Sequence, residues 1–240
     1  MTRALPLFRS IAEVESAVVE CRRCPRLVAW REEVARTKRA AFRDQTYWGR
    51  PVPAFGDPDA RLLVVGLAPA AHGGNRTGRM FTGDRSGDWL YRALFEAGFA
   101  SQPESIAPGD GLTLSDCLIT APVRCAPPAN QPLPAERANC QPYLEAELAL
   151  TPRVRVMVAL GGIAWTQLHR VLEELGWGLP ARRVPFGHGA EVEVARPAEA
   201  GGGGVHLLGS YHPSQQNTFT GTLTREMFAL IWTRARALLS

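Results

Sequence analysis

The stretch Arg61-Leu-Leu-Val-Val-Gly66 is a short apolar run that ends at a glycine, and a long glycine-rich segment follows it over residues 67–87. An apolar run of this length, bounded by turn residues, is typical of a buried β-strand. Residues 117–121, 154–160 and 205–210 form three further runs of the same kind. Because helical patterns separate these runs, the sequence predicts a parallel sheet covered by helices on both faces.

The helical patterns lie between the strands and at both ends of the chain. The first covers residues 10–42 and is interrupted at Cys21-Arg-Arg-Cys24. Pro25 suits the first position of the helix that follows, because the missing N–H costs nothing there. We expect further helices at residues 88–98, 136–150 and 163–175, an ordered loop at 43–59, and a small hairpin or flexible insertion at 180–204. A terminal helix is expected to pack on the sheet through one face, comprising Leu223, Met227, Leu230, Ile231 and Leu238.

Length and composition fit an ordinary globular chain: 240 residues, 45% hydrophobic and 21% charged, which predicts one domain over residues 1–240. No apolar run approaches the ~20 residues that a membrane span requires. The first residues, Met-Thr-Arg-Ala-Leu-Pro-Leu-Phe, are too short and broken for a signal peptide. We therefore expect a cytoplasmic monomer with no membrane partner. The net charge of +4 permits nucleic-acid binding without demanding it.

The five cysteines divide into four candidate metal ligands and one core residue. Cys21 and Cys24 have C-x-x-C spacing, and Cys125 and Cys140 lie about a hundred residues further along. Disulfides are not expected inside a cell, and a thioredoxin-like pair would follow a strand. Four thiolates can hold either zinc or a 4Fe–4S cluster. Structural zinc sites usually use two short pairs such as C-x-x-C, and only one such pair is present here. The spacing therefore favours the cluster and leaves zinc as the alternative. Cys117 lies inside an apolar strand and is expected in the core.

Open parallel sheets bind ligands at the carboxyl ends of their strands, so the residues after each strand are the candidates for chemistry. The loop after the first strand contains neither a P-loop nor a G-x-G-x-x-G motif, but it offers the aromatic ring of Phe81 and the carboxylate of Asp84. The last strand is followed by Tyr211-His-Pro-Ser-Gln-Gln-Asn217, which places the His212 imidazole at the mouth of the sheet. The other histidines, His72, His169, His188 and His206, are expected to be structural.

Several of these motifs occur together and in order. They are Cys21-x-x-Cys24, the Gly66-Leu-Ala-Pro loop with Asn75-Arg-Thr-Gly-Arg and Phe81-Thr-Gly-Asp84, Val123-Arg-Cys125-Ala-Pro-Pro-x-Asn130 with Cys140, and His212-Pro-Ser-Gln-Gln-Asn217. From about Cys21 to the terminal helix, the chain resembles the family 5 uracil-DNA glycosylases (the UDGb type). The resemblance implies a three-layer α/β/α fold around a four-stranded parallel sheet, with an N-terminal helical segment and a 4Fe–4S cluster on the four cysteines.

The resemblance also implies an activity: flipping a uracil out of DNA and hydrolysing its N-glycosidic bond, which leaves an abasic site. It implies that Phe81 stacks on the flipped base, that Gly66, Leu67 and Ala68 line the pocket, and that Asn130 contacts the base or the flanking strand. We assign His212 to the leaving uracil, whose developing charge it would stabilise. Asp84 is assigned to the sugar cation and the attacking water, although the same residue would also suit a helix N-cap. Phosphate or intercalation contacts are expected from Arg76, Arg79, Arg85, Ser214 and Gln215.

Two positions in the expected pocket bear on specificity. Leu67 and Ala121 stand where other, related uracil-DNA glycosylases carry polar residues. The resemblance implies that the absence of both polar residues is a feature of family 5 itself. A site that lacks discriminating hydrogen bonds selects its substrate less strictly, so we expect activity on other deaminated bases such as hypoxanthine. The same two positions keep open an alternative, a catalytically inactive nucleic-acid-binding member of the superfamily.

Overall fold

The computed structural model describes residues 8–240, so the first seven residues, in which no signal peptide was predicted, lie outside the described residues. One sheet organises the described chain, in the strand order β1-β3-β2-β4-β6-β5. The four central strands run parallel to one another. They are β3 (Cys117–Thr120), β2 (Leu62–Val65), β4 (Val156–Leu160) and β6 (Gly204–Ser210). These are the four strands that the apolar runs predict, shifted by one or two residues at their ends.

The prediction of a purely parallel, four-stranded sheet is wrong at both edges. The sheet is mixed and has six strands, because β1 (Phe55–Gly56) pairs antiparallel with β3 and β5 (Glu191–Ala195) pairs antiparallel with β6. β1 is only two residues long and lies in a segment rich in turn residues. In β5, buried valines alternate with more exposed residues, the pattern of a strand with one covered face. Neither edge strand therefore has the continuous apolar signature of the central four.

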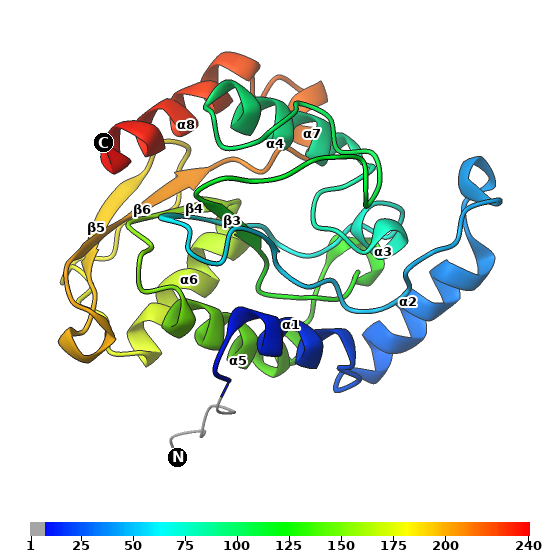
Figure 1. The fold of residues 1–240 in the computed structure, drawn as a ribbon, viewed down its shortest axis with the longest axis horizontal. Coiled ribbons are helices and arrows are strands. Elements are labelled where there is room, and N and C mark those ends of the chain that lie inside the picture. The colour runs from blue at the N-terminus through cyan, green and yellow to red at the C-terminus, as the bar shows by residue number, and fades with distance from the viewer. Residues whose placement is uncertain (1–7) are drawn as a thin grey trace.

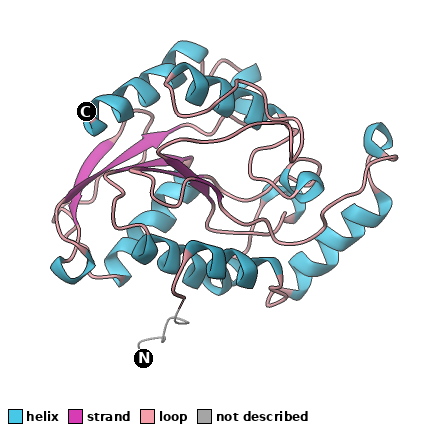
Figure 2. Cartoon of the chain, viewed as in Figure 1, coloured by secondary structure: helices cyan, strands magenta, loops and turns pink. Residues whose placement is uncertain are grey.

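Helices cover both faces of the sheet, as the sequence predicts (Figures 1 and 2). On one face, α4 (Arg85–Glu96) and α8 (Arg225–Leu239) bury side chains such as Leu94 and Trp232 against alternate residues of the strands. On the other face, α5 (Pro134–Leu150) and α6 (Gly162–Glu174) pack in the same way. The N-terminal helix α1 (Ile11–Val19) packs on α5 rather than on the sheet. The three-layer α/β/α arrangement is therefore confirmed.

Shorter elements complete the chain. They are α2 (Pro25–Thr37), α3 (Gly74–Thr77), α7 (Gln215–Phe219), and the 3-10 turns Ala40–Phe42, Pro128–Asn130 and Ala198–Ala200. Pro25 occupies the start of α2, as expected. Along residues 8–240, no helix combines the length and the apolar character needed to cross a bilayer.

Two helix predictions need correction. Helix α4 begins at Arg85, not near residue 88, because Asp84 caps its first turn. In α8, Leu230 is 67% exposed, so it does not belong to the packed face. That face carries Phe228, Ile231, Trp232, Ala235 and Leu239, whose three- and four-residue spacing follows the helical repeat.

Candidate active site

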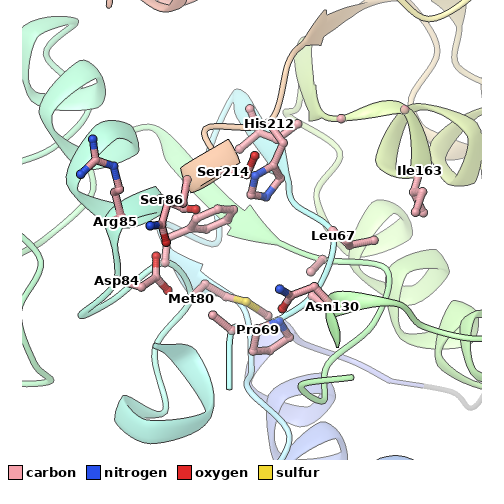
Figure 3. A pocket seen from close by; sticks show the side chains of 18 residues that line it. Leu67, Pro69, Met80, Asp84, Arg85, Ser86, Asn130, Ile163, His212 and Ser214 are labelled. Carbon is pink, nitrogen blue, oxygen red and sulfur yellow. The ribbon is translucent and has the colours of Figure 1, made fainter. Parts of the chain in front are cut away.

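A cavity of about 420 Å³ opens at the carboxyl ends of all four parallel strands. Its walls are residues 67–70 after β2, Ala121 after β3, residues 161–163 after β4, and His212 and Ser214 after β6. Strand β2 lies between β3 and β4. The chain therefore passes from β2 to β3 on one side, and then crosses to β4 on the other side of β2. This reversal of strand order is where open α/β sheets bind ligands. Figure 3 shows Asp84, Asn130 and His212 around the cavity.

Phe81 forms an aromatic wall of the cavity and is held in an uncommon backbone conformation. Its φ is +51°, in the left-handed region that non-glycine residues rarely adopt. The Phe81 ring lies so close to Gly66 that a Cβ added there would come within 2.7 Å of it. The centroid of the ring lies 5.9 Å from that of the His212 imidazole. Such local strain persists where the surrounding structure enforces it, and it clusters at functional sites.

Asp84 lines the cavity and also caps helix α4, so both interpretations of this residue are compatible. Its Oδ1 accepts a hydrogen bond from Gly87 N at 3.0 Å. Its other oxygen lies against Gly73, where an added Cβ would come within 1.9 Å of Oδ2. Burial raises the pKa of Asp84 above its ordinary value, while the backbone N–H groups of Gly87 and Ser86 oppose that rise. The carboxylate is therefore fixed in position between the helix start and Gly73.

His212 is a neutral imidazole in the cavity wall. Burial lowers the pKa of His212 to about 4, since a desolvated ring resists protonation. Asn217 Nδ2 donates to the His212 carbonyl oxygen at 2.9 Å and so fixes the backbone at this point. The ring atom Nδ1 has no hydrogen-bond partner within the described residues. The imidazole therefore has hydrogen-bonding capacity left for a ligand.

Much of the remaining wall is apolar. Leu67, Ala68 and Ala121 line the cavity as expected, and none of them has a polar side-chain atom. Asn130 lines it too, from an exposed position at which φ is +56°. Pro69 and Ala70 line it as part of the same loop as Leu67, but sequence reasoning did not find the other lining residues, namely Met80, Ser86, Leu160, Gly161, Gly162 and Ile163. The glycine pair directly after the 154–160 run was the available signal for the β4 contribution.

The five predicted DNA contacts divide into two groups. Arg85, Ser214 and Gln215 line the cavity, and the Arg85 guanidinium lies 4.0 Å from the ring centroid of Phe219, a residue that is 62% exposed. Arg76 and Arg79 are instead buried, which places them away from a DNA surface. Arg76 donates to the carbonyl oxygens of His72 and Gly83, while Arg79 forms an ion pair with Asp110 at 2.7 Å. Their contacts are those of residues that brace the loop from inside.

The four candidate metal ligands, Cys21, Cys24, Cys125 and Cys140, line one small cavity in which α1, α2, the β3–α5 loop and α5 meet. Nitrogen donors approach all four sulfurs, and the donor to Cys21 is the exposed residue Arg23. Arg31 Nη1 lies 3.0 Å from Cys125 Sγ, the Arg124 backbone N lies 3.3 Å from Cys140 Sγ, and Asn139 Nδ2 lies 3.6 Å from Cys24 Sγ.

Among residues 8–240, no group of three or more Cys, His, Asp or Glu side chains is arranged to hold a metal ion. Cys117 is fully buried in β3, as predicted, and burial raises the pKa of its thiol. The donor set at the other four cysteines is therefore four thiols that line one cavity.

The remaining histidines have structural partners outside the cavity. His72 Nδ1 lies 3.0 Å from Tyr47 Oη, and His169 Nδ1 lies 2.9 Å from the Trp165 carbonyl oxygen. His188 contacts the Met227 carbonyl oxygen, and His206 lies 3.3 Å from Glu191. Each of the four is held by contacts within the fold, in agreement with the expectation that they are structural.

Comparison with known proteins identifies the family. The model of the uracil DNA glycosylase superfamily matches residues 53–236. A type-5 uracil-DNA glycosylase of Mycobacterium tuberculosis is 55% identical over 230 residues, which cover 95% of this chain and 82% of that protein. Those of Thermus thermophilus and Pyrobaculum aerophilum are 56% and 47% identical, over 91% and 92% of this chain and 93% and 89% of their own lengths. The chain belongs to the uracil DNA glycosylase superfamily and, within it, to the type-5 uracil-DNA glycosylases.

Proposed function

We propose that this protein excises uracil from DNA by hydrolysing the N-glycosidic bond, leaving an abasic site as the first step of base excision repair. The observation that carries the proposal is one cavity bounded by Phe81, Asp84 and His212, at the strand ends of a superfamily named for this activity. A base inside a duplex is inaccessible, so the nucleotide must flip into this cavity. The Phe81 ring offers a face on which the flipped base stacks.

His212 would stabilise the leaving base. As the glycosidic bond breaks, negative charge develops on uracil, and a fixed hydrogen-bond donor near that charge lowers the barrier. A neutral imidazole suits this role, because its pKa of about 4 keeps the ring unprotonated at neutral pH. Such a ring donates from one nitrogen without moving a proton.

Asp84 would act on the sugar. Glycosidic cleavage passes through an oxocarbenium-like sugar, which a nearby carboxylate stabilises while it positions water. The backbone N–H of Gly87 occupies Oδ1. Asp84 lines a cavity whose other walls are largely apolar, where an electrostatic interaction is stronger than in water.

A direct assay separates an enzyme from an inactive binder, an alternative that none of the comparisons supports. Duplex DNA with one uracil is incubated with the protein, and abasic sites are then cleaved with alkali. Strand cleavage is expected from the wild-type protein. Asp84→Asn, which keeps an N-capping side chain, should cleave far more slowly while its thermal unfolding is unchanged. Binding of uracil-containing DNA without any cleavage would establish the inactive alternative.

We further propose that the pocket accepts other deaminated bases such as hypoxanthine. Leu67 and Ala121 line the cavity without side-chain hydrogen-bonding groups, and strict discrimination requires such groups. A panel of oligonucleotides carrying uracil, hypoxanthine or ordinary bases tests this. Excision of hypoxanthine at a measurable fraction of the uracil rate is expected, and Ala121→Asn should raise the preference for uracil. Cleavage of uracil alone would refute broad specificity.

For the cofactor, we propose a 4Fe–4S cluster on Cys21, Cys24, Cys125 and Cys140, with zinc as the alternative. The four thiols line one cavity, which supplies the four thiolate ligands that such a cluster takes. Structural zinc sites commonly use two short ligand pairs, whereas this chain has a single C-x-x-C pair. The sulfurs of such a cluster also accept N–H hydrogen bonds, such as those from the nitrogen donors that approach these cysteines. The cluster would brace the fold by joining α1, α2 and α5.

Metal content decides between the two cofactors. Protein purified without air should be brown and contain about four iron and four sulfide per chain. Cys125→Ser should lose the colour, whereas Cys117→Ala, the matched change at the core cysteine, should keep it. A colourless wild-type sample that contains one zinc would establish the alternative.

DNA contacts are proposed for Arg85, Ser214 and Gln215, which line the same cavity as the base-binding residues. Arg85→Met should weaken binding of unrelated duplexes equally and reduce the dependence of log affinity on log salt by about one unit. An unchanged slope would assign Arg85 to another role. We also propose that the chain is a single-domain cytoplasmic monomer. Packing of α4, α8, α5 and α6 around one sheet supports the single domain, and sedimentation at micromolar concentration tests the monomer.

A further inference from the structure

Arg31 is a buried cation on helix α2, with 2% of its surface exposed. Its Nη1 lies 3.0 Å from Cys125 Sγ, and both terminal nitrogens lie 3.3 Å from the Cys21 carbonyl oxygen. Within residues 8–240, no carboxylate forms an ion pair with Arg31. Glu32, its neighbour in sequence, pairs with Arg22 instead. Burying a charge without a counter-charge is costly, so the environment of this guanidinium requires a negative partner.

A second buried arginine at the same cavity, Arg124, does have a carboxylate as its counter-charge. Arg124 also lines the four-cysteine cavity, but its guanidinium pairs with Glu147, and both side chains are fully buried. Only its backbone N–H approaches a sulfur. The Arg124 charge is therefore balanced by a carboxylate, whereas the Arg31 charge faces a cysteine sulfur. A neutral thiol is a weak acceptor, while a sulfur that carries negative charge forms a short, strong bond with a guanidinium.

We infer that Arg31 is the internal counter-charge of the iron–sulfur cluster and raises its reduction potential. The inference rests on the proposed cluster. Four thiolate ligands make the assembly anionic, and each added electron makes it more so. A fixed positive charge in contact with one ligand sulfur therefore stabilises the reduced form more than the oxidised form. Arg31 is a positioning residue, since it acts through Cys125 and does not touch the substrate.

The backbone of Arg31 connects the cluster to the active-site loop. Asn75 Nδ2 donates to the Arg31 carbonyl oxygen at 3.2 Å, and Asn75 is fully buried in α3, between Leu67 and Phe81 in sequence. One residue of α2 thus contacts a cluster ligand through its side chain and the loop through its carbonyl group. Arg31 therefore places a positive charge beside the cluster and also supports the loop that forms part of the pocket wall.

Redox titration of the cluster-containing protein tests the inference. The midpoint potential for one-electron reduction is measured by spectroelectrochemistry under argon, with visible absorbance and electron paramagnetic resonance as readouts. Arg31→Met should shift the midpoint to a more negative value. The shift should change the oxidised-to-reduced ratio at least tenfold at the wild-type midpoint, which corresponds to about 59 mV for one electron.

Two further variants separate charge from shape. Arg31→Lys keeps the positive charge and should restore most of the wild-type potential. Arg36→Met removes the same charge from the same helix at an exposed position, where Arg36 pairs with Glu33, and should leave the potential unchanged because water screens it. If Arg31→Met fails to retain iron while Arg31→Lys retains it, the requirement for a counter-charge is supported directly.

Other outcomes overturn the inference. If Arg31→Met has the same midpoint potential as the wild-type protein, the Arg31 charge has no effect on the cluster. Loss of iron from Arg31→Met and Arg31→Lys alike would assign a purely steric role to the side chain. A wild-type protein without iron and sulfide would fail at the first measurement, in the metal analysis, and would remove the cluster proposal together with the inference.

Discussion

The pocket wall and the inner side of the β2–α4 loop differ in how their polar groups are satisfied. In the pocket wall, His212 Nδ1, beyond the end of β6, lacks a hydrogen-bond partner within the described chain, and Phe81 of the loop has a left-handed backbone conformation. On the inner side, Arg79 donates to Thr82, Ser105 and Asp110, and Arg76 donates to backbone carbonyl groups. The first side holds unsatisfied and strained groups, whereas the second holds satisfied, buried cations.

This difference shows how the loop can hold strain at all. A left-handed phenylalanine costs of order 1–3 kcal/mol and persists only where surrounding contacts enforce it. The arginine network on the inner side provides such contacts, because it ties residues 76–83 to the chain around Ser105 and Asp110. Side chains on the pocket side should therefore affect the reaction, and those on the inner side should affect stability.

The largest effect is expected from His212→Ala, which removes the donor to the leaving base. Excision should slow by about 10²–10³-fold, the usual loss when one such donor is removed. The free energy of unfolding should change little, because no hydrogen bond from the described residues to the ring nitrogen Nδ1 is lost. Single-turnover kinetics and urea unfolding measure the two quantities. His206→Ala, within strand β6 that leads to His212 but paired with Glu191, is the control and should excise at the wild-type rate.

Arg79→Met tests the inner side and should give the next largest effect. Removing one partner of a buried ion pair leaves Asp110 uncompensated, so the free energy of unfolding should fall by about 3 kcal/mol. Urea denaturation measures it. Arg170→Met removes an exposed arginine paired with Glu174 and should cost at most about 0.5 kcal/mol. An Arg79→Met protein of wild-type stability that binds DNA more weakly would return Arg79 to the DNA surface.

The pH dependence of stability should report His212. Its pKa is about 4 in the folded protein and about 6.5 when unfolded, so between these values the unfolded chain binds more protons. Stability is therefore complete above pH 6.5 and falls as the pH drops towards 4, by at most about 3 kcal/mol. In His212→Ala this part of the acid loss should disappear. Identical pH profiles for the two proteins would contradict a buried, neutral His212.

The smallest effect is expected from Gly66→Ala. The added Cβ would approach the Phe81 ring to 2.7 Å, so the ring must shift away from its stacking position. Base stacking on an aromatic ring contributes about 1–3 kcal/mol, and KM for uracil-containing DNA should rise about tenfold. Gly187→Ala places its Cβ in open space and is the matched control. Equal KM values for the two variants would separate Phe81 from base binding.

Sequence patterns predicted the central part of the fold well, for a physical reason. β2, β3 and β4 are buried along their whole length, and β6 is buried over most of it, so each appears as a mainly apolar run. The edge strand β1 has only two residues and β5 is half exposed. Such strands form because they pair with a neighbouring strand, and a local sequence pattern does not show that pairing. The pocket followed from the segments after the strands, since Phe81 and Asp84 lie in the loop after β2 and His212 lies just after β6.

The arginines show what a local pattern cannot decide. Arg76, Arg79 and Arg85 occur in one glycine-rich loop and look alike in sequence. The partners that distinguish them lie elsewhere in the chain: Asp110 for Arg79, Gln45 for Arg76, and Thr218 for Arg85. Long-range packing therefore determines which arginine is buried and which is available to DNA. The contribution of Ile163 to the pocket was missed for the same reason.

The two antiparallel edge strands have a consequence for association between copies of the protein. A parallel sheet that ended at β3 and β6 would present unpaired backbone groups to which another chain could add a strand. β1 covers one edge with only two residues, and its Gly56 packs so tightly on β3 that an added Cβ would come within 2.2 Å of the Cys117 carbonyl oxygen. β5 covers the other edge and carries Glu191 and Glu193, charges that disfavour strand addition. Both edges are thus protected from edge-to-edge aggregation.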